Sequence, residues 1–482
     1  MNVLIVGAGF AGIGMAIRLK QAGMTDFTIL ERAEEIGGTW RDNHYPGAAC
    51  DVESHLYSFS FDPNPDWTRR FAAQKEILEY MKRCAEKYGV YPHVRFGTSV
   101  RCARWDERAA LWNVELLDGA TIPARVLVSG CGGLSRPSYP DLAGLKRFAG
   151  KTFHSARWDH SFPLDGKNNV AVIGTGASAI QIVPAIAPRV KRLSVFQRTA
   201  PWILPKPDRA IRPIERAIYR RVPVVQTLVR AKIYWQREAL ALGFVIEPRL
   251  LTLLEGVGRR YLKRSIKDRV LREKLSPHYA MGCKRILPTN DYYPAIQLPN
   301  VELVTDSIRE VTRDGILTED GKERRFDAIV LATGFQAAEH AAPFDIEGRD
   351  GRSLDTEWRD GAEAYLGTTV TGFPNLFLMV GPNTGLGHNS MIVMIESQIA
   401  YIRDAIETMN RERLKLIAVR AGAQASYNAR TQARLAGTVW ASGCKSWYQT
   451  RSGKNTTLWP GFTFEFRRRT HRFDSEAYEL VR

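Results

Sequence analysis

The sequence predicts an α/β fold in which one chain builds two Rossmann-like dinucleotide-binding domains. Residues 2–31 read as strand, glycine-rich turn, helix and second strand, and residues 169–197 repeat that order. A third apolar strand, FDAIVLATGF, ends in Ala-Thr-Gly at 332–334. A chain of 482 residues is longer than one hydrophobic core usually organises, so more than one domain is expected.

We place the domain boundaries near 140 and 335. The first domain then comprises residues 1–140 and 336–482, and the second comprises residues 141–335. The stretch at about 206–276 has few turn signals and much helical character. We expect it to be a helical insertion in the second domain.

The first glycine turn follows the strand Asn2–Val6 and has the G-x-G-x-x-G spacing at Gly7, Gly9 and Gly12. These glycines allow a tight turn, close approach of a pyrophosphate, and packing of helix on strand. Glu31 ends the next strand, where an acid accepts hydrogen bonds from a ribose diol. The turn therefore predicts a dinucleotide site.

The second turn has Gly174, Gly176 and Ala179, and its second strand has a different ending. That strand ends in VFQRT, with Arg198 and Thr199 in place of an acid. A cation suits the 2′-phosphate of NADPH, which an acid would repel. The second site is therefore expected to bind NADPH.

The formal net charge of +17 is concentrated in one part of the chain. Between Lys206 and Lys274 there are 18 Lys and Arg against 7 Asp and Glu. No nucleic-acid motif accompanies this excess, so a nucleic-acid partner is not expected. Three interpretations remain: a basic surface near the NADPH phosphate, peripheral contact with anionic lipid, or a solvated helical face.

The hydrophobicity pattern, the N-terminal residues and the cysteines narrow the class of protein further. No run of about 20 uncharged apolar residues predicts a transmembrane helix. The chain opens directly on a strand without a basic leader, so a cytoplasmic location is expected. Its six cysteines form no C-x-x-C pair, which argues against a zinc site and against the dithiol of pyridine-disulfide reductases. We expect free thiols and no metal.

Five motifs together carry a family resemblance. FAGKTFHSARWD at 148–159 sets Phe148, Gly150, His154, Trp158 and Asp159 directly before the second turn. GGTWRDNHYPGAACD runs from Gly37 to Asp51, and the other three motifs are GCKRILPTND from Gly282, GPNTGLGHNSM from Gly381, and SWYQTRSGKNTTLWPGF from Ser446. With these motifs the chain resembles the flavin-dependent (type I, class B) Baeyer–Villiger monooxygenases over nearly its whole length.

The resemblance implies an oxidoreductase with FAD and NADPH as cofactors. In this family NADPH reduces the flavin, oxygen adds as a C4a-peroxide, and a small-molecule ketone becomes an ester or lactone. Arg285 matches the active-site arginine and Asp51 the aspartate that holds it. His154 belongs to a string that couples domain movement to the site and is not expected to be a base.

The resemblance, together with the two turns, gives a set of cofactor contacts. For FAD we expect Gly7, Gly9, Gly12, Glu31, Gly38, Thr39, Trp40, Asp51, Tyr57, Val100 and Met391. For NADP we expect Gly174, Thr175, Gly176, Ser178, Gln181, Arg198, Thr199, Lys284 and Trp447. Trp447 matches an aromatic residue on a loop that folds over the cofactor.

Two alternatives stay open at this point. A flavin-containing monooxygenase would place the oxygen on sulfur or nitrogen with the same cofactors, and a cofactor-binding flavoprotein or oxidase would transfer none to substrate. The Trp158–Asp159 ending and the Arg285–Asp51 pair favour ketone oxidation.

Overall fold

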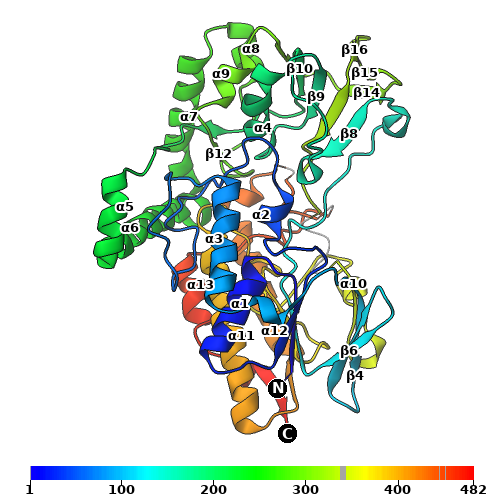
Figure 1. The fold of residues 1–482 in the computed structure, drawn as a ribbon, viewed down its shortest axis with the longest axis vertical. Coiled ribbons are helices and arrows are strands. Elements are labelled where there is room, and N and C mark those ends of the chain that lie inside the picture. The colour runs from blue at the N-terminus through cyan, green and yellow to red at the C-terminus, as the bar shows by residue number, and fades with distance from the viewer. Residues whose placement is uncertain (1, 337–342, 445, 451) are drawn as a thin grey trace.

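Two five-stranded parallel sheets lie toward opposite ends of the molecule in the computed structural model, which describes residues 2–336, 343–444, 446–450 and 452–482 (Figure 1). The two chain ends lie together at the end that carries the first sheet (Figure 1). This arrangement confirms the predicted fold class of two Rossmann-like units.

The first sheet has the strand order β19-β7-β1-β2-β3. Its central strand β1 is buried along its whole length, because helices cover one face of the sheet and the small antiparallel sheet of residues 100–124 packs on the other. Helix α1 follows the first glycine turn and packs against α11. The strands are β1 (Val3–Val6), β2 (Phe27–Leu30), β3 (Val94–Arg95), β7 (Val126–Ser129) and β19 (Leu376–Leu378), with α1 (Phe10–Gln21) and α11 (Met391–Glu412).

The second sheet has the order β13-β10-β9-β17-β8. The helix after the second glycine turn, α4, packs against α9 and ends two residues after Pro184, which a helix interior tolerates poorly. The elements are β8 (Lys151–His154), β9 (Asn169–Ile173), β10 (Arg192–Phe196), β13 (Val301–Val304), β17 (Ala328–Leu331), α4 (Ala179–Ile186) and α9 (Tyr292–Ile296).

The chain passes between the two sheets along two adjacent segments, and the Phe148–Asp159 string lies beside them. Ser138 N–H donates to the Gly334 carbonyl at 2.9 Å, and the Thr333 hydroxyl donates to the Ser138 carbonyl at 2.5 Å. His154 is fully buried, with its ring 5.5 Å from that of Tyr139 and 5.7 Å from that of Phe335. Burial lowers the pKa of His154 to about 4, so the ring is a neutral packing group.

Four helices fill most of the basic segment, and α5 and α6 lie side by side on one flank (Figure 1). They are α5 (Pro213–Arg221), α6 (Pro223–Ala241), α7 (Leu251–Ser265) and α8 (Arg269–Lys274), and a π-helical turn at Leu242–Ile246 extends α6. None of the helices in the described part of the chain is long and apolar enough to cross a membrane.

The remaining elements form smaller sheets and covering helices. The strands are β4 (Val100–Asp106), β5 (Leu111–Leu116), β6 (Thr121–Ala124), β11 (Ile203–Leu204), β12 (Leu287–Pro288), β14 (Ile308–Val311), β15 (Gly315–Thr318), β16 (Glu323–Arg325), β18 (Asp345–Glu347), β20 (Leu416–Val419) and β21 (Tyr478–Val481). The helices are α2 (Thr39–Asp42), α3 (Gln74–Lys87), α10 (Leu354–Glu357), α12 (Ala421–Ala436) and α13 (Thr463–Arg469).

The expectation that all six cysteines are free is wrong for two of them. Cys283 and Cys444 form a disulfide, with their Cα atoms 6.2 Å apart. The two residues are 161 positions apart, and only the folded chain brings them together. Local spacing therefore gave no sign of the pair. Cys50, Cys84, Cys102 and Cys131 are free thiols, as expected.

Candidate active site

Both glycine turns line a single cavity of about 1650 Å³. All the residues expected to contact FAD or NADP line it except Gly12. Gly12 lies behind the first turn, where a Cβ atom would come within 1.9 Å of the Gly7 carbonyl oxygen. Its expected role in close packing of the turn is therefore structural and independent of ligand contact.

The first turn meets a second glycine segment across the cavity wall. A Cβ atom on Gly38 would lie 3.1 Å from the Gly9 Cα atom, so this approach favours glycine at position 38. Glu31 is buried and already bound: its carboxylate accepts from Ala8 N–H at 2.8 Å and pairs with Arg41 at 3.1 Å. The carboxylate is thereby fixed at the edge of the turn.

The second turn is more open. Gly174 has φ +120°, and a Cβ there would lie 2.4 Å from the Ala332 carbonyl oxygen, whereas a Cβ on Gly176 would meet nothing within 4 Å. Thr175 Oγ1 donates to the Thr199 carbonyl at 2.9 Å, which joins the turn to the segment after β10. Arg198 is exposed beside it.

Lys284 adds a second cation next to Arg198. Its ammonium lies 5.0 Å from the centre of the Tyr279 ring. Burial, with a smaller contribution from the charge of Arg198, lowers the pKa of Lys284. The two adjacent cations repel each other in the free protein, and a bound phosphate would relieve that repulsion. This corner of the cavity therefore fits the 2′-phosphate of NADPH.

Arg285 and Asp51 form a two-pronged ion pair at the cavity wall. Arg285 Nε donates to one carboxylate oxygen at 2.7 Å, and Nη2 donates to the other at 2.8 Å. Burial alone would raise the pKa of Asp51, but the Arg285 charge and hydrogen bonds hold it below its usual value. The Asp51 charge in turn raises the pKa of Arg285, so both groups stay ionised.

Further residues that the sequence did not single out support this pair. Arg237 on α6 bonds Glu53 at 2.7 Å and reaches the Asp51 carbonyl at 3.4 Å. Tyr448 lies close enough to Arg285 to interact with it, and burial raises the pKa of Tyr448 to about 12. Tyr448 stands within the fifth motif and was findable from it, whereas no local pattern marks Arg237.

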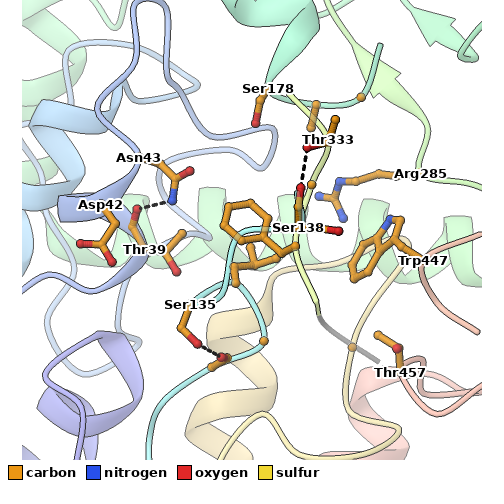
Figure 2. A pocket seen from close by; sticks show the side chains of 18 of the residues that line it. Thr39, Asp42, Asn43, Ser135, Ser138, Ser178, Arg285, Thr333, Trp447 and Thr457 are labelled. Carbon is orange, nitrogen blue, oxygen red and sulfur yellow. Dashed lines mark hydrogen bonds between the residues drawn. The ribbon is translucent and has the colours of Figure 1, made fainter. Parts of the chain in front are cut away.

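The C-terminal loop reaches the same wall. Figure 2 shows the Trp447 indole on the same side of the cavity as the Arg285 guanidinium, across from Thr39 and Asp42. Trp447 is 46% exposed and its ring lies 4.5 Å from that of Tyr448. The Cys283–Cys444 disulfide joins the segments that carry Arg285 and Trp447. Arg451, in the same fifth motif, lies outside the described residues.

Two expected contacts acquire additional roles in the structure. The Gln181 side chain accepts from the Tyr45 hydroxyl at 2.9 Å and donates to the Ala49 carbonyl at 2.9 Å, so it ties α4 to the segment before Asp51. Met391 is the first residue of α11, whose Ser390 cap accepts from Ile392 N–H at 3.2 Å. The positive end of this long helix therefore faces the cavity.

The donor set fits two dinucleotides. Two glycine turns of the pyrophosphate-binding type open into one cavity, an acid stands at one turn, and two cations stand at the other. No cluster of three or more His, Cys, Asp or Glu suited to a metal occurs among the residues that the structure describes. The fold and the site thus define a flavoprotein with a nicotinamide co-substrate.

Comparisons with known proteins define the family. The model for pyridine nucleotide-disulphide oxidoreductases matches residues 4–234, which hold both glycine turns. A Baeyer–Villiger monooxygenase of Pseudomonas aeruginosa is 52% identical over the whole chain and 91% of its own length. One from Streptomyces coelicolor is 47% identical over the whole chain and 93% of its length. The chain belongs to the Baeyer–Villiger monooxygenase family.

Solved structures agree with this assignment. OTEMO in complex with FAD and NADP superposes with a TM-score of 0.91 at 29% identity, covering 100% of this chain and 99% of that one. A closed structure of cyclohexanone monooxygenase gives 0.88 at 30% identity, covering 99% and 98%.

Proposed function

We propose that this enzyme inserts one atom of molecular oxygen next to the carbonyl of a small-molecule ketone, with the Arg285–Asp51 pair as the polarising group. The observation that carries this proposal is the two-pronged ion pair at the wall of a cavity lined by both glycine turns. The protein is an FAD-containing, NADPH-dependent Baeyer–Villiger monooxygenase.

When bound, FAD supplies electron transfer from NADPH and the activation of oxygen. The FAD contacts are proposed as Gly7, Gly9, Glu31, Gly38, Thr39, Trp40, Asp51, Tyr57, Val100 and Met391, with Gly12 supporting the turn. Arg285 then provides a permanent positive charge where negative charge develops on the substrate carbonyl oxygen. A fixed cation in a site shielded from water acts there without reorganisation.

The role of Asp51 is to hold that cation. A lone guanidinium beside a buried wall would be free to turn toward solvent, whereas two hydrogen bonds fix its plane. Arg237 and Glu53 hold the Asp51 segment in turn. The direction of the guanidinium is thus set by residues from widely separated parts of the chain.

On the co-substrate side, Arg198, Thr199 and Lys284 bind the adenosine phosphate in this proposal. Gly174, Thr175, Gly176 and Ser178 border the diphosphate, and Gln181 holds the neighbouring segment. Trp447 covers the cavity beside Arg285 and helps to exclude water, because water at the reacting centre diverts the reaction to hydrogen peroxide.

The domain division is part of the proposal. Residues 1–140 and 336–482 would hold FAD, residues 141–335 would hold NADP, and the paired segments at 133–140 and 333–336 would serve as the joint. A cytoplasmic location, where NADPH is maintained, is proposed with it.

The test is mass-spectrometric product analysis. Purified FAD-loaded enzyme is mixed with NADPH, isotopically labelled oxygen, and a panel of linear, cyclic and aryl ketones plus a thioether. An ester or lactone carrying one labelled oxygen is the expected result. Sulfoxide alone, or hydrogen peroxide without oxygenated product across the panel, would overturn the proposal and the role of Arg285.

A further inference from the structure

Helix α6 and the turn that extends it carry a continuous apolar stripe on their solvent face. Val224, Leu228, Trp235, Leu242 and Ile246 are between 42% and 64% exposed. They recur every four or seven residues, and the exposed Ala231 and Ala239 fill the intervening helical turns. At the rise of an α-helix the stripe is about 33 Å long.

The opposite face of α6, which is turned toward the protein, is unusually polar. Gln226 donates to the Asn64 carbonyl, and Arg230 to the His55 and Ser58 carbonyls. Glu238 is 2% exposed and accepts from Asn389 and Thr463. Leu and Trp side chains that stay in water forgo the free energy of burial, so folding gains nothing from placing them on the solvent face of α6. A contiguous exposed stripe of this kind marks an interaction surface.

Residues beyond α6 widen the stripe. Phe464 of α13 is 45% exposed, and its ring lies 6.1 Å from that of Trp235. We call Val224, Leu228, Trp235, Leu242, Ile246 and Phe464 the apolar ridge. Helix α5, which packs against α6, exposes Ile214 and Ile218 as well.

The ridge is set in a positive surface. Arg221 is exposed at the end of α5, just before α6 begins, and Lys232 is exposed one helical turn after Leu228. Arg467 and Arg468 stand one turn after Phe464. The sequence between residues 216 and 246 contains a single carboxylate, Glu238, which is buried. An occupant of this surface must therefore offer apolar contact and negative charge together.

We propose that the apolar ridge docks the enzyme on the surface of an anionic lipid bilayer. A long apolar stripe flanked by Arg and Lys and centred on a Trp is the pattern of a helix that lies in the membrane interface. A second copy of this chain would bring two positive surfaces together, which opposes association. The docking is independent of the proposed reaction.

The test uses full-length, FAD-loaded enzyme and sedimentation with two kinds of vesicle. One kind contains phosphatidylglycerol and phosphatidylcholine, and the other phosphatidylcholine alone. The ridge variant is Leu228→Ser/Trp235→Ser, and the charge variant is Arg221→Gln/Lys232→Gln. Matched controls are Leu480→Ser/Val481→Ser, exposed at the C-terminal strand, and Arg108→Gln, exposed between β4 and β5. Strand β4 lies on the flank opposite α5 and α6 (Figure 1).

The expected result is binding to the anionic vesicles that weakens with salt and falls about tenfold or more in both the ridge and charge variants. The controls should bind like the unaltered enzyme, and all variants should keep their thermal midpoint and their NADPH oxidation rate in solution. Equal binding by the ridge variant, or no preference for anionic vesicles, would overturn the proposal. So would a dimer in ultracentrifugation that the ridge variant abolishes without any vesicle binding.

Discussion

The two glycine turns share the same strand–turn–helix backbone, but the residues around them differ in charge and exposure. At the first, Glu31 is buried and bound to Ala8 and Arg41, and Gly9 lies against Gly38. At the second, Gly176 faces open space, Arg198 is exposed and Lys284 lies beside it. The first turn is closed and carries a carboxylate that is already paired, whereas the second is open and cationic, which suits a retained flavin and an exchanging co-substrate.

The Arg285–Asp51 pair takes one partner from each half. Asp51 ends the motif that begins near the first turn, whereas Arg285 follows Lys284 on the co-substrate side. The two halves therefore meet at this ion pair. Substitutions at the pair, at the second turn and at the nearby disulfide can separate what each contributes to the reaction.

The largest effect is expected where the two halves meet. Arg285→Ala should lower ester formation about a thousandfold or more, because the cation that stabilises developing charge is lost. Arg285→Lys keeps the charge without the fork and should recover part of the rate. Product yield and hydrogen peroxide are measured together against NADPH consumed. Arg101→Ala, which removes an exposed cation at the cavity rim, serves as the control. Unchanged ester yield in Arg285→Ala would remove the arginine from the chemistry.

The next effect tests the charge contrast directly. Arg198→Glu gives the second turn the acid of the first and should raise the KM for NADPH about a hundredfold, because a charge-assisted phosphate contact becomes a repulsion. The KM for NADH should change little or improve. Steady-state kinetics with both co-substrates decide the outcome, and an equal loss with both would mean that Arg198 acts on the fold.

A smaller effect is expected at the disulfide that joins the Arg285 and Trp447 segments. Cys444→Ser should leave ester formation detectable but raise the fraction of NADPH lost as hydrogen peroxide about threefold, since the covering loop is less restrained. Cys102→Ser, at a buried free thiol, is the matched control. Thiol titration of the denatured protein should find four free cysteines, and six would contradict the pairing.

The subtlest effect is on the shape of a pH profile. The lowered pKa of Lys284 means that its ammonium loses its proton at lower pH than a free lysine does. The KM for NADPH should therefore begin to rise on the alkaline side before the ordinary lysine range is reached. Lys284→Arg should flatten that rise, because arginine stays charged. An identical alkaline rise in both enzymes would assign it to another group.

Much of the fold was predictable because its signals are local. The strands Val3–Val6, Asn169–Ile173 and Ala328–Leu331 are short apolar runs beside glycine turns, and each lies within the range predicted for it. The motif around Asp51 and the motif around Arg285 also supplied both members of the ion pair. A pattern of residue types along the chain is enough for such features.

Other features depend on contacts between distant segments and left no local mark. Cys283 meets Cys444 across 161 residues, Gln181 is held by Tyr45 and Ala49, and Arg237 reaches the Asp51 segment from an unmarked helix. The sequence also showed α6 as basic and helical without telling which face is buried. Packing decided that its Glu238 and Gln226 point inward and its Trp235 outward.

The sequence by itself determined the two dinucleotide turns and the acid and the arginine that distinguish them, since each rests on neighbouring residues. The resemblance to a known family supplied Asp51, Lys284 and Arg285. The tertiary structure decided that both turns open into a single cavity, that Arg285 lies 2.7 Å from Asp51, and that an apolar ridge faces solvent. The physical reason is that burial, pairing and orientation are properties of segments brought together in space, which no single segment encodes.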